Sequence, residues 1–247
     1  MSQKVLRLLN RILNTVIVLS LIAAGLYSIY AIWDNNRIYE APLELQTELK
    51  KLKPDEKKPS FQELLKLNPD VVGWVTLEGT QIDDPIVQGE DNREYLNKNV
   101  YGEYALAGSI FLDSRCDREF QDKYQLVYGH HMEKHRMFGD LDLYLKKKFF
   151  KKHTIGTLMV PGKTYPLQIL ASMKVDANDA YIFDPQTYPA DPEAFLQMVL
   201  SKSKNVHKEL MQKLEKEPEK YSVLALSTCS SEKEEERIVV LAVYEHD

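Results

Sequence analysis

The chain contains little cysteine and has no excess of positive charge. Its 247 residues include only two cysteines, Cys116 and Cys229, and the formal net charge is −5. Small secreted domains held together by disulfides are rich in cysteine, so a disulfide framework is not expected. A bond between these two cysteines is an alternative, but it would consume the thiol of Cys229. The short lysine clusters are typical of solvated faces, so we expect no nucleic-acid partner.

Charge is also absent from a long segment near the N-terminus. Residues 15–33 are mostly apolar and carry no charged side chain. A helix of about 20 such residues crosses a bilayer, so this segment is predicted to be transmembrane. Basic residues precede it and acidic ones follow, which predicts a cytoplasmic N-terminus at residues 1–14 and an extracellular remainder. A cleaved signal peptide is the alternative, but the length of the run and its terminal aromatics favour an uncleaved signal anchor.

Short β-like runs dominate the rest of the chain. Residues 34–59 are polar and lysine-rich and are predicted to form a helical stalk and linker, whereas residues 60–247 are predicted to form one globular domain. Helical patterns are also present, at Met137–Tyr144, Pro192–Ser201 and Lys204–Glu215. Eight apolar runs bounded by turn residues predict strands, enough for a barrel or a sandwich. These runs are Val71–Leu77, Thr80–Val87, Leu106–Leu112, Tyr124–Tyr128, Thr154–Val160, Tyr165–Val175, Tyr221–Thr228 and Arg237–Tyr244.

Cys229 ends one apolar run and Arg237 begins the next. The polar segment Ser230–Glu236 between them is predicted to be a solvated turn between antiparallel strands. Residues on one face of a strand recur at every second position, so Cys229 shares a face with Ser227. If that face coincides with the face of Arg237, the guanidinium can reach the thiol or an oxyanion beside it. A nearby positive charge favours the reactive thiolate. Alternatively, Arg237 is only a charge at a strand end.

His130 follows a third apolar run that ends in Gly129. Glycine allows other backbone to approach closely, so an imidazole here can belong to a site rather than to the surface. His131 and His135 do not form the zinc motif H-E-x-x-H, because Glu133 lies midway between them. No further ligand accompanies them, so we expect no metal and no cofactor.

Together these motifs resemble the sortases of Gram-positive bacteria, and class B most closely. The family's nucleophile motif T-L-x-T-C corresponds to Ala225–Cys229, with alanine replacing the first threonine. Its histidine follows a strand-end glycine, as His130 does, and its arginine begins R-I-V-V, as Arg237 does. The resemblance extends from about residue 60 to the C-terminus. It includes Gly73–Thr80, Ile82–Gly89 and Gly108–Asp113, which are similar to early strands of the family.

The resemblance implies a mainly β fold and a cysteine transpeptidase. The fold would be a closed eight-stranded barrel with N-terminal helices and a helical insertion before the cysteine strand. Cys229 would attack the threonine carbonyl of a C-terminal sorting signal and form a thioester. His130 would act as general acid and base, and Arg237 would stabilise the oxyanion and the substrate.

The resemblance also implies partners and a substrate groove. The partners would be secreted proteins bearing a sorting motif, an amine of a cell-wall precursor or a pilin, and membrane lipid around the N-terminal helix. By position, the groove residues would be Asn92, Leu96, Tyr181, Ile182, Ser227 and Thr228. Alternatively, Tyr181 and Ile182 are core anchors of the helical insertion.

Three alternatives to a wall-anchoring enzyme stay open. A class B pilus polymerase would join pilins through lysine. A papain-like cysteine protease has its cysteine before its histidine, whereas this chain has the order His130, Cys229, Arg237. A non-catalytic, membrane-tethered binding module would not need the thiol.

Overall fold

The chain divides into two compact units, Met1–Ala41 and Pro42–Asp247. The structure is a computed structural model that describes residues 3–55, 57, 60–229 and 235–245, with Ile38, Tyr39 and Cys229 described by their backbone alone. The predicted turn Ser230–Glu236 therefore lies largely outside the described residues. The start of the globular domain that we predicted, residue 60, falls inside the second unit.

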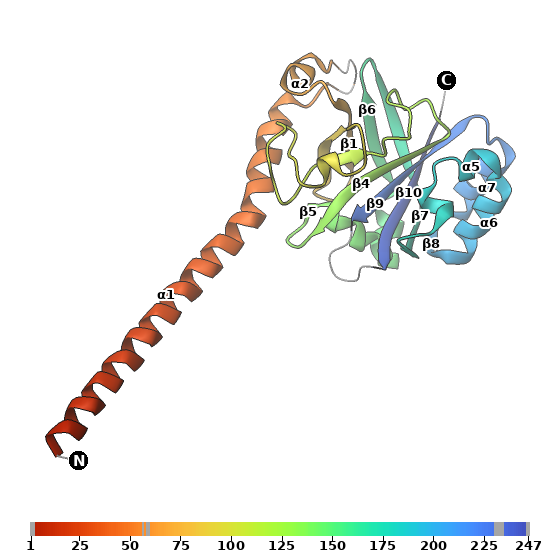
Figure 1. Cartoon of the computed structure of the whole chain (residues 1–247). Coiled ribbons are helices and arrows are strands. Elements are labelled where there is room, and N and C mark those ends of the chain that lie inside the picture. The colour runs from red at the N-terminus through yellow and green to blue at the C-terminus, as the bar shows by residue number, and fades with distance from the viewer. Residues whose placement is uncertain (1–2, 56, 58–59, 230–234, 246–247) are drawn as a thin grey trace. The chain divides into compact units, whose positions relative to one another are not determined.

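A single helix, α1 (Gln3–Leu49), makes up the described part of the first unit and continues into the second (Figure 1). It includes all of the uncharged segment 15–33. The apolar side chains of this segment are exposed, with Leu21 68% and Leu26 64% exposed. By length and composition, this helix is able to cross a membrane.

The second unit is built on a closed β-sheet (Figure 1). Its strands follow the order β10-β9-β4-β3-β2-β1-β6-β7, and β7 pairs with β10 to close eight strands into a barrel. The predicted barrel is therefore confirmed. The strands are β1 (Val71–Leu77), β2 (Asp83–Val87), β3 (Ile110–Leu112), β4 (Tyr124–Met132), β6 (Ile155–Val160), β7 (Lys163–Asp176), β9 (Tyr221–Cys229) and β10 (Glu236–Glu245).

Two further strands extend the sheet outside the barrel. β5 (Arg136–Met137) pairs with β4, and β8 (Ser203–Val206) pairs with β7. The helix predicted at Lys204–Glu215 is therefore partly wrong, because its first residues form β8 and the helix α7 begins at Lys208. An edge strand is selected by its partner strand as much as by its own sequence.

Short helices connect the strands, and four of them form an insertion between β7 and β9. In Figure 1, helices α5, α6 and α7 cluster beside β7 and β8. The side chain of Asp191 caps α6 by accepting a hydrogen bond from Ala194 N, and Pro192 begins the helix. The helices are η1 (Lys50–Leu52), α2 (Gln62–Leu67), η2 (Glu94–Leu96), η3 (Phe138–Leu145), α3 (Lys147–Lys152), α4 (Ala180–Phe183), α5 (Thr187–Ala190), α6 (Pro192–Lys202) and α7 (Lys208–Lys216).

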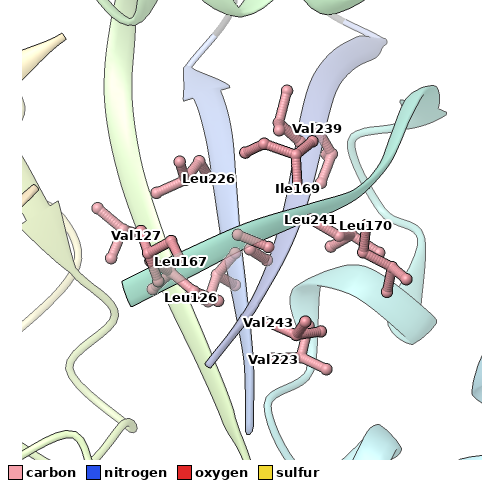
Figure 2. Packing of buried hydrophobic residues seen from close by; sticks show 14 of the residues in the cluster. Leu126, Val127, Leu167, Ile169, Leu170, Val223, Leu226, Val239, Leu241 and Val243 are labelled. Atoms are coloured by element: carbon pink, nitrogen blue, oxygen red, sulfur yellow. The ribbon is translucent and has the colours of Figure 1, made fainter. Parts of the chain in front are cut away.

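The main core lies where β4, β7, β9 and β10 meet (Figure 2). Leu226 of β9, Val239 of β10 and Ile169 of β7 are at most 1% exposed. Burying one such side chain stabilises the fold by roughly 1.5–3 kcal/mol. Successive residues of β9 are buried on both faces, which explains why its sequence is a continuous apolar run and not an alternating one.

A second core joins the end of α1 to the outside of β1 and β2. Leu49 is 2% exposed and belongs to the same cluster as Phe61, Trp74 and Val87. These contacts make the last turns of α1 part of the globular unit.

Charged groups reinforce this second core. Lys53 Nζ lies 2.8 Å from Asp83 Oδ1, which also accepts a hydrogen bond from Trp74 Nε1 at 2.8 Å. Gln46 Nε2 donates to both carboxylate oxygens of Asp84, at 3.0 and 2.9 Å. The start of β2 therefore holds the end of α1 through Asp84 and the residue after η1 through Asp83.

Candidate active site

Strand pairing places His130 beside Cys229, and extension of the β9–β10 register places Arg237 on the other side of Cys229. β4 and β9 run parallel, with His130 opposite Cys229. β9 and β10 run antiparallel, with Val239 opposite Ser227. Continuing this register by two residues on each strand puts Arg237 opposite Cys229. The faces of β9 and β10 therefore coincide, which is the condition that the sequence left open, and the three positions form a row across adjacent strands.

His130 is held by the backbone of a neighbouring loop. Its Nε2 atom lies 2.6 Å from the carbonyl oxygen of Leu96. A carbonyl can only accept a hydrogen bond, so Nε2 carries the hydrogen and donates it. In the neutral imidazole, the Nδ1 lone pair is then the atom that is able to take up a proton.

Gly129 allows β4 to reach this position. A Cβ atom on Gly129 would lie 2.5 Å from Cδ1 of Ile110 and 2.7 Å from Cγ of Phe138. A larger residue would therefore require the side chains of Ile110 and Phe138 to shift. Close packing against Ile110 and Phe138 thus explains why a glycine precedes His130.

Arg237 supplies a permanent positive charge at the start of β10. The residue is half-buried, and its strand is paired on the other side with Val175 of β7. One guanidinium nitrogen donates to the carbonyl oxygen of Glu236 at 3.2 Å. A guanidinium placed in this way is suited to stabilising an oxyanion that forms near the end of β9.

Asn92 is held by a buried carboxylate. Its Nδ2 donates to Asp113 Oδ2 at 2.9 Å, and its Oδ1 accepts from Ser114 N at 2.8 Å. Asp113 is fully buried, which by itself would raise the pKa of its carboxyl group, but the ion pair with Arg115 lowers that pKa overall. The Asn92 amide therefore fixes the loop before η2 against the end of β3.

Tyr181 and Ile182 are adjacent in α4 but have different environments. Tyr181 is 40% exposed, whereas Ile182 is 0% exposed. The Ile182 carbonyl accepts a hydrogen bond from the Tyr124 hydroxyl at 2.8 Å. The structure therefore places Ile182 in the core and leaves Tyr181 accessible to a ligand.

Ser227 and Thr228 are buried in β9, at 0% and 1% exposed. Thr228 Oγ1 accepts a hydrogen bond from Ile238 N at 3.2 Å and so ties β9 to β10. As β9 is an inner strand covered on both faces, the side chains of Ser227, Thr228 and Ile182 are not accessible to a substrate in this structure. All three side chains are packed in the core of this structure, and their role in a substrate groove stays a prediction.

Comparison with known proteins identifies the family. No family model matches the chain. Over 182 residues, the chain is 37% identical to Sortase B of Listeria monocytogenes, and the match covers 74% of this chain and 72% of the relative. The chain belongs to the class B sortases.

Solved class B sortases share its fold. A Streptococcus pyogenes class B sortase involved in pilus biogenesis is 38% identical, with a TM-score of 0.65 over 74% of this chain and 97% of that chain. A Staphylococcus aureus sortase B–substrate complex is 30% identical, with a TM-score of 0.64 over 83% of this chain and 92% of that chain.

Two histidine–carboxylate pairs beside His130 in this sortase were not predicted. His131 Nε2 lies 2.9 Å from Asp142 Oδ2, and His135 Nδ1 contacts Asp140. Both pairs tie the β4–β5 hairpin to η3. Among the described residues, no group of three or more histidine, cysteine and acidic side chains is able to hold a metal ion. Sequence spacing gives no signal for these pairs, because their carboxylates come from a separate helix.

Proposed function

We propose that this class B sortase is a transpeptidase that cleaves a C-terminal sorting signal after threonine and transfers the protein to an amine of cell-wall peptide. The observation that carries the proposal is the row of His130, Cys229 and Arg237 across β4, β9 and β10. The family of cysteine transpeptidases to which the chain belongs supports it.

The proposed reaction has two acyl transfers. The Cys229 thiol passes its proton to Nδ1 of His130, the resulting thiolate attacks the threonine carbonyl, the peptide bond breaks, and a thioester forms. His130 gives a proton from Nδ1 to the leaving amine and later accepts one from the incoming amine. Arg237 stabilises the oxyanion of each tetrahedral intermediate, and loss of one such donor typically costs about 2.7–4 kcal/mol of barrier.

A pilin lysine is the second candidate for the amine. It is favoured by the 38% identity to a Streptococcus pyogenes class B sortase involved in pilus biogenesis. For contacts with the sorting signal we propose Asn92, Leu96 and Tyr181, which are half-buried or exposed.

For the N-terminal region we propose the domain limits that the sequence predicts. Residues 1–14 are cytoplasmic, residues 15–33 cross the membrane as an uncleaved anchor, and residues 34–59 form the stalk before the catalytic domain at 60–247. The long apolar helix α1 supports the anchor. Protease digestion of intact cells should remove an epitope placed at the C-terminus and leave one placed at residue 1.

Mass spectrometry tests the proposed function. The full chain in detergent is incubated with a library of sorting-signal peptides, and a covalent acyl adduct on Cys229 is expected. Addition of an amine should release the adduct as an amide product. Cys229→Ala should form no adduct, and His130→Ala and Arg237→Ala should lose about 10²–10³ or more in turnover.

The alternatives predict different results. If added amine neither enters the product nor raises turnover, the protein is a protease and not a transpeptidase. A binding module predicts that Cys229→Ala keeps full function in cells. Offering a cell-wall peptide amine and a pilin lysine peptide in competition separates wall anchoring from pilus polymerisation.

A further inference from the structure

The loop from Leu96 to Ser109 carries the backbone carbonyl that holds His130. The chain leaves η2 at Leu96 and enters β3 at Ile110. The carbonyl oxygen of Leu96 lies 2.6 Å from His130 Nε2. The orientation of the imidazole therefore depends on where this loop places one carbonyl group.

Residues in the second half of the loop donate hydrogen bonds to the backbone carbonyls on either side of Leu96. The Tyr95 carbonyl accepts from Ser109 N at 3.0 Å, and the Asn97 carbonyl accepts from Ala105 N at 2.9 Å. The Lys98 carbonyl accepts from Ser109 Oγ at 2.8 Å. These neighbouring bonds fix the peptide planes around Leu96, so its carbonyl is held toward β4.

Gly108 lies against this set of carbonyls. Its φ angle is +59°, and a Cβ atom there would lie 2.5 Å from the Leu96 oxygen, 2.6 Å from the Tyr95 oxygen and 2.8 Å from the Leu96 carbonyl carbon. Real Cβ atoms essentially never show contacts under 3.0 Å. The atoms in the way belong to the backbone and cannot rotate aside as a side chain would.

We propose that Gly108 is a positioning residue for acyl transfer. Because Gly108 has no side chain, the Leu96 carbonyl is able to reach His130 Nε2. That contact keeps the hydrogen on Nε2 and leaves Nδ1 to move the proton. The inference rests on the proposed role of His130 as general acid and base, and it adds a requirement for one tautomer.

A matched control exists in the same loop. Gly102 also has a positive φ, +81°, but a Cβ atom there would meet nothing within 4 Å. Gly102→Ala therefore imposes the backbone strain of alanine at positive φ without the carbonyl contact. Gly108→Ala imposes both, so the difference between the two variants reports the displacement of the Leu96 carbonyl.

The experiment compares the full-length wild type, Gly108→Ala and Gly102→Ala in detergent. The first readout is the tautomer of His130 from ¹⁵N spectra of histidine-labelled protein, assigned with His130→Gln. The second is kcat and KM for amine transfer to a sorting-signal peptide. For Gly108→Ala we expect a mixture of tautomers and a fall in kcat of about tenfold, the effect of one lost hydrogen bond, with little change in KM. Gly102→Ala should match the wild type in both readouts.

Two results would overturn the inference. One is a Gly108→Ala variant that keeps the wild-type tautomer and kcat. The other is a Gly102→Ala variant that changes as Gly108→Ala does, because general strain would then explain the effect. The tautomer readout does not need turnover. A wild type that transfers nothing to amines would therefore overturn the proposed function and leave the test of Gly108 intact.

A second variant covers the case in which Gly108→Ala does not fold. Ser109→Ala removes the hydrogen bond from the Ser109 hydroxyl to the Lys98 carbonyl and leaves Gly108 in place. It should loosen the same loop and give partial tautomer mixing, with a fall in kcat of about threefold. An unchanged tautomer and unchanged kcat in this variant would refute the inference.

Discussion

Asp84 should make the stability of the globular unit fall as the pH rises. Burial raises the pKa of its carboxyl group from its usual value of 3.8 to about 6, with the neighbouring Asp83 charge adding to the rise. Hydrogen bonds from Gln46 and the Asp83 amide, and the charge of Lys50, oppose it only in part. The folded state therefore binds a proton at Asp84 more tightly than the unfolded state does.

The sign and size follow from this difference in pKa. The stabilisation is fully present below pH 3.8 and is lost as the pH rises toward about 6. A pKa that rises from 3.8 to about 6 corresponds to about 3 kcal/mol, at about 1.4 kcal/mol for each pKa unit. At neutral pH, the folded protein thus bears the full cost of a buried charge.

Asp84→Asn tests this reasoning, because the amide keeps the shape of the carboxyl group and does not titrate. Urea unfolding of the full chain in detergent, followed by the fluorescence of the buried Trp74, gives the free energy of unfolding at each pH. The free energy of unfolding of the wild type minus that of the variant should decrease by about 2 kcal/mol between pH 4 and pH 7, because part of the full effect is already lost at pH 4. The substitution also alters hydrogen bonds, but a pH-independent effect of this kind on the free energy of unfolding cancels when the two pH values are compared.

The adjacent Asp83 is the matched control, since its pKa moves the other way. Burial alone would raise the pKa of Asp83, but hydrogen bonds from Lys53, Trp74 and Thr76 lower it overall. Its contribution to stability is present above pH 3.8 and is lost as the pH falls, so Asp83→Asn should give a difference of opposite slope. A pH-independent difference for Asp84→Asn would refute the assignment of a buried, proton-binding carboxyl group.

Three further tests, with five substitutions in all, probe packing around the site. Ile182→Ala should lower the free energy of unfolding by about 2–5 kcal/mol, because the side chain is fully buried, whereas Tyr181→Ala should change it much less; urea denaturation measures both. Thr228→Val should cost about 1–3 kcal/mol by leaving the Ile238 amide without its acceptor, and Thr228→Ser should restore most of that loss. Gly139→Ala should disrupt the first turn of η3, because its Cβ would lie 2.0 Å from the Met132 carbonyl oxygen; a large fall in melting temperature is expected, and an unchanged value would contradict the contact.

The barrel strands were predictable because burial leaves a local pattern in the sequence. β1 begins and ends where its apolar run does, and β9 extends only one residue beyond its run. Local features, namely the alternation of faces and the length of the segment after Cys229, made a row of catalytic positions possible. The register decides whether the row forms, and the sequence could not supply it, because it depends on pairing between strands far apart in the chain.

β8 shows why some elements were missed. Its sequence, Ser-Lys-Asn-Val, is polar, and its residues are half-buried or exposed, so it has neither an apolar run nor an alternating one. It forms a strand because Ala171–Met173 of β7 provides backbone partners. Such a partner is a tertiary feature, and propensity alone favours continuing the helical pattern of α7 backward.

Leu96 shows a different limit, because its contact with His130 is made by the backbone. The family resemblance predicts Leu96 as a groove residue, but every amino acid carries the carbonyl group that reaches His130. No substitution at position 96 would therefore leave a pattern that reports this contact. The trace that it does leave is at Gly108, where the chain tolerates no Cβ atom. Gly108 begins a strand motif, but the carbonyl groups that it faces explain it better than the strand that it precedes. Those carbonyls lie about twelve residues earlier in the chain, so only the folded loop brings them next to Gly108.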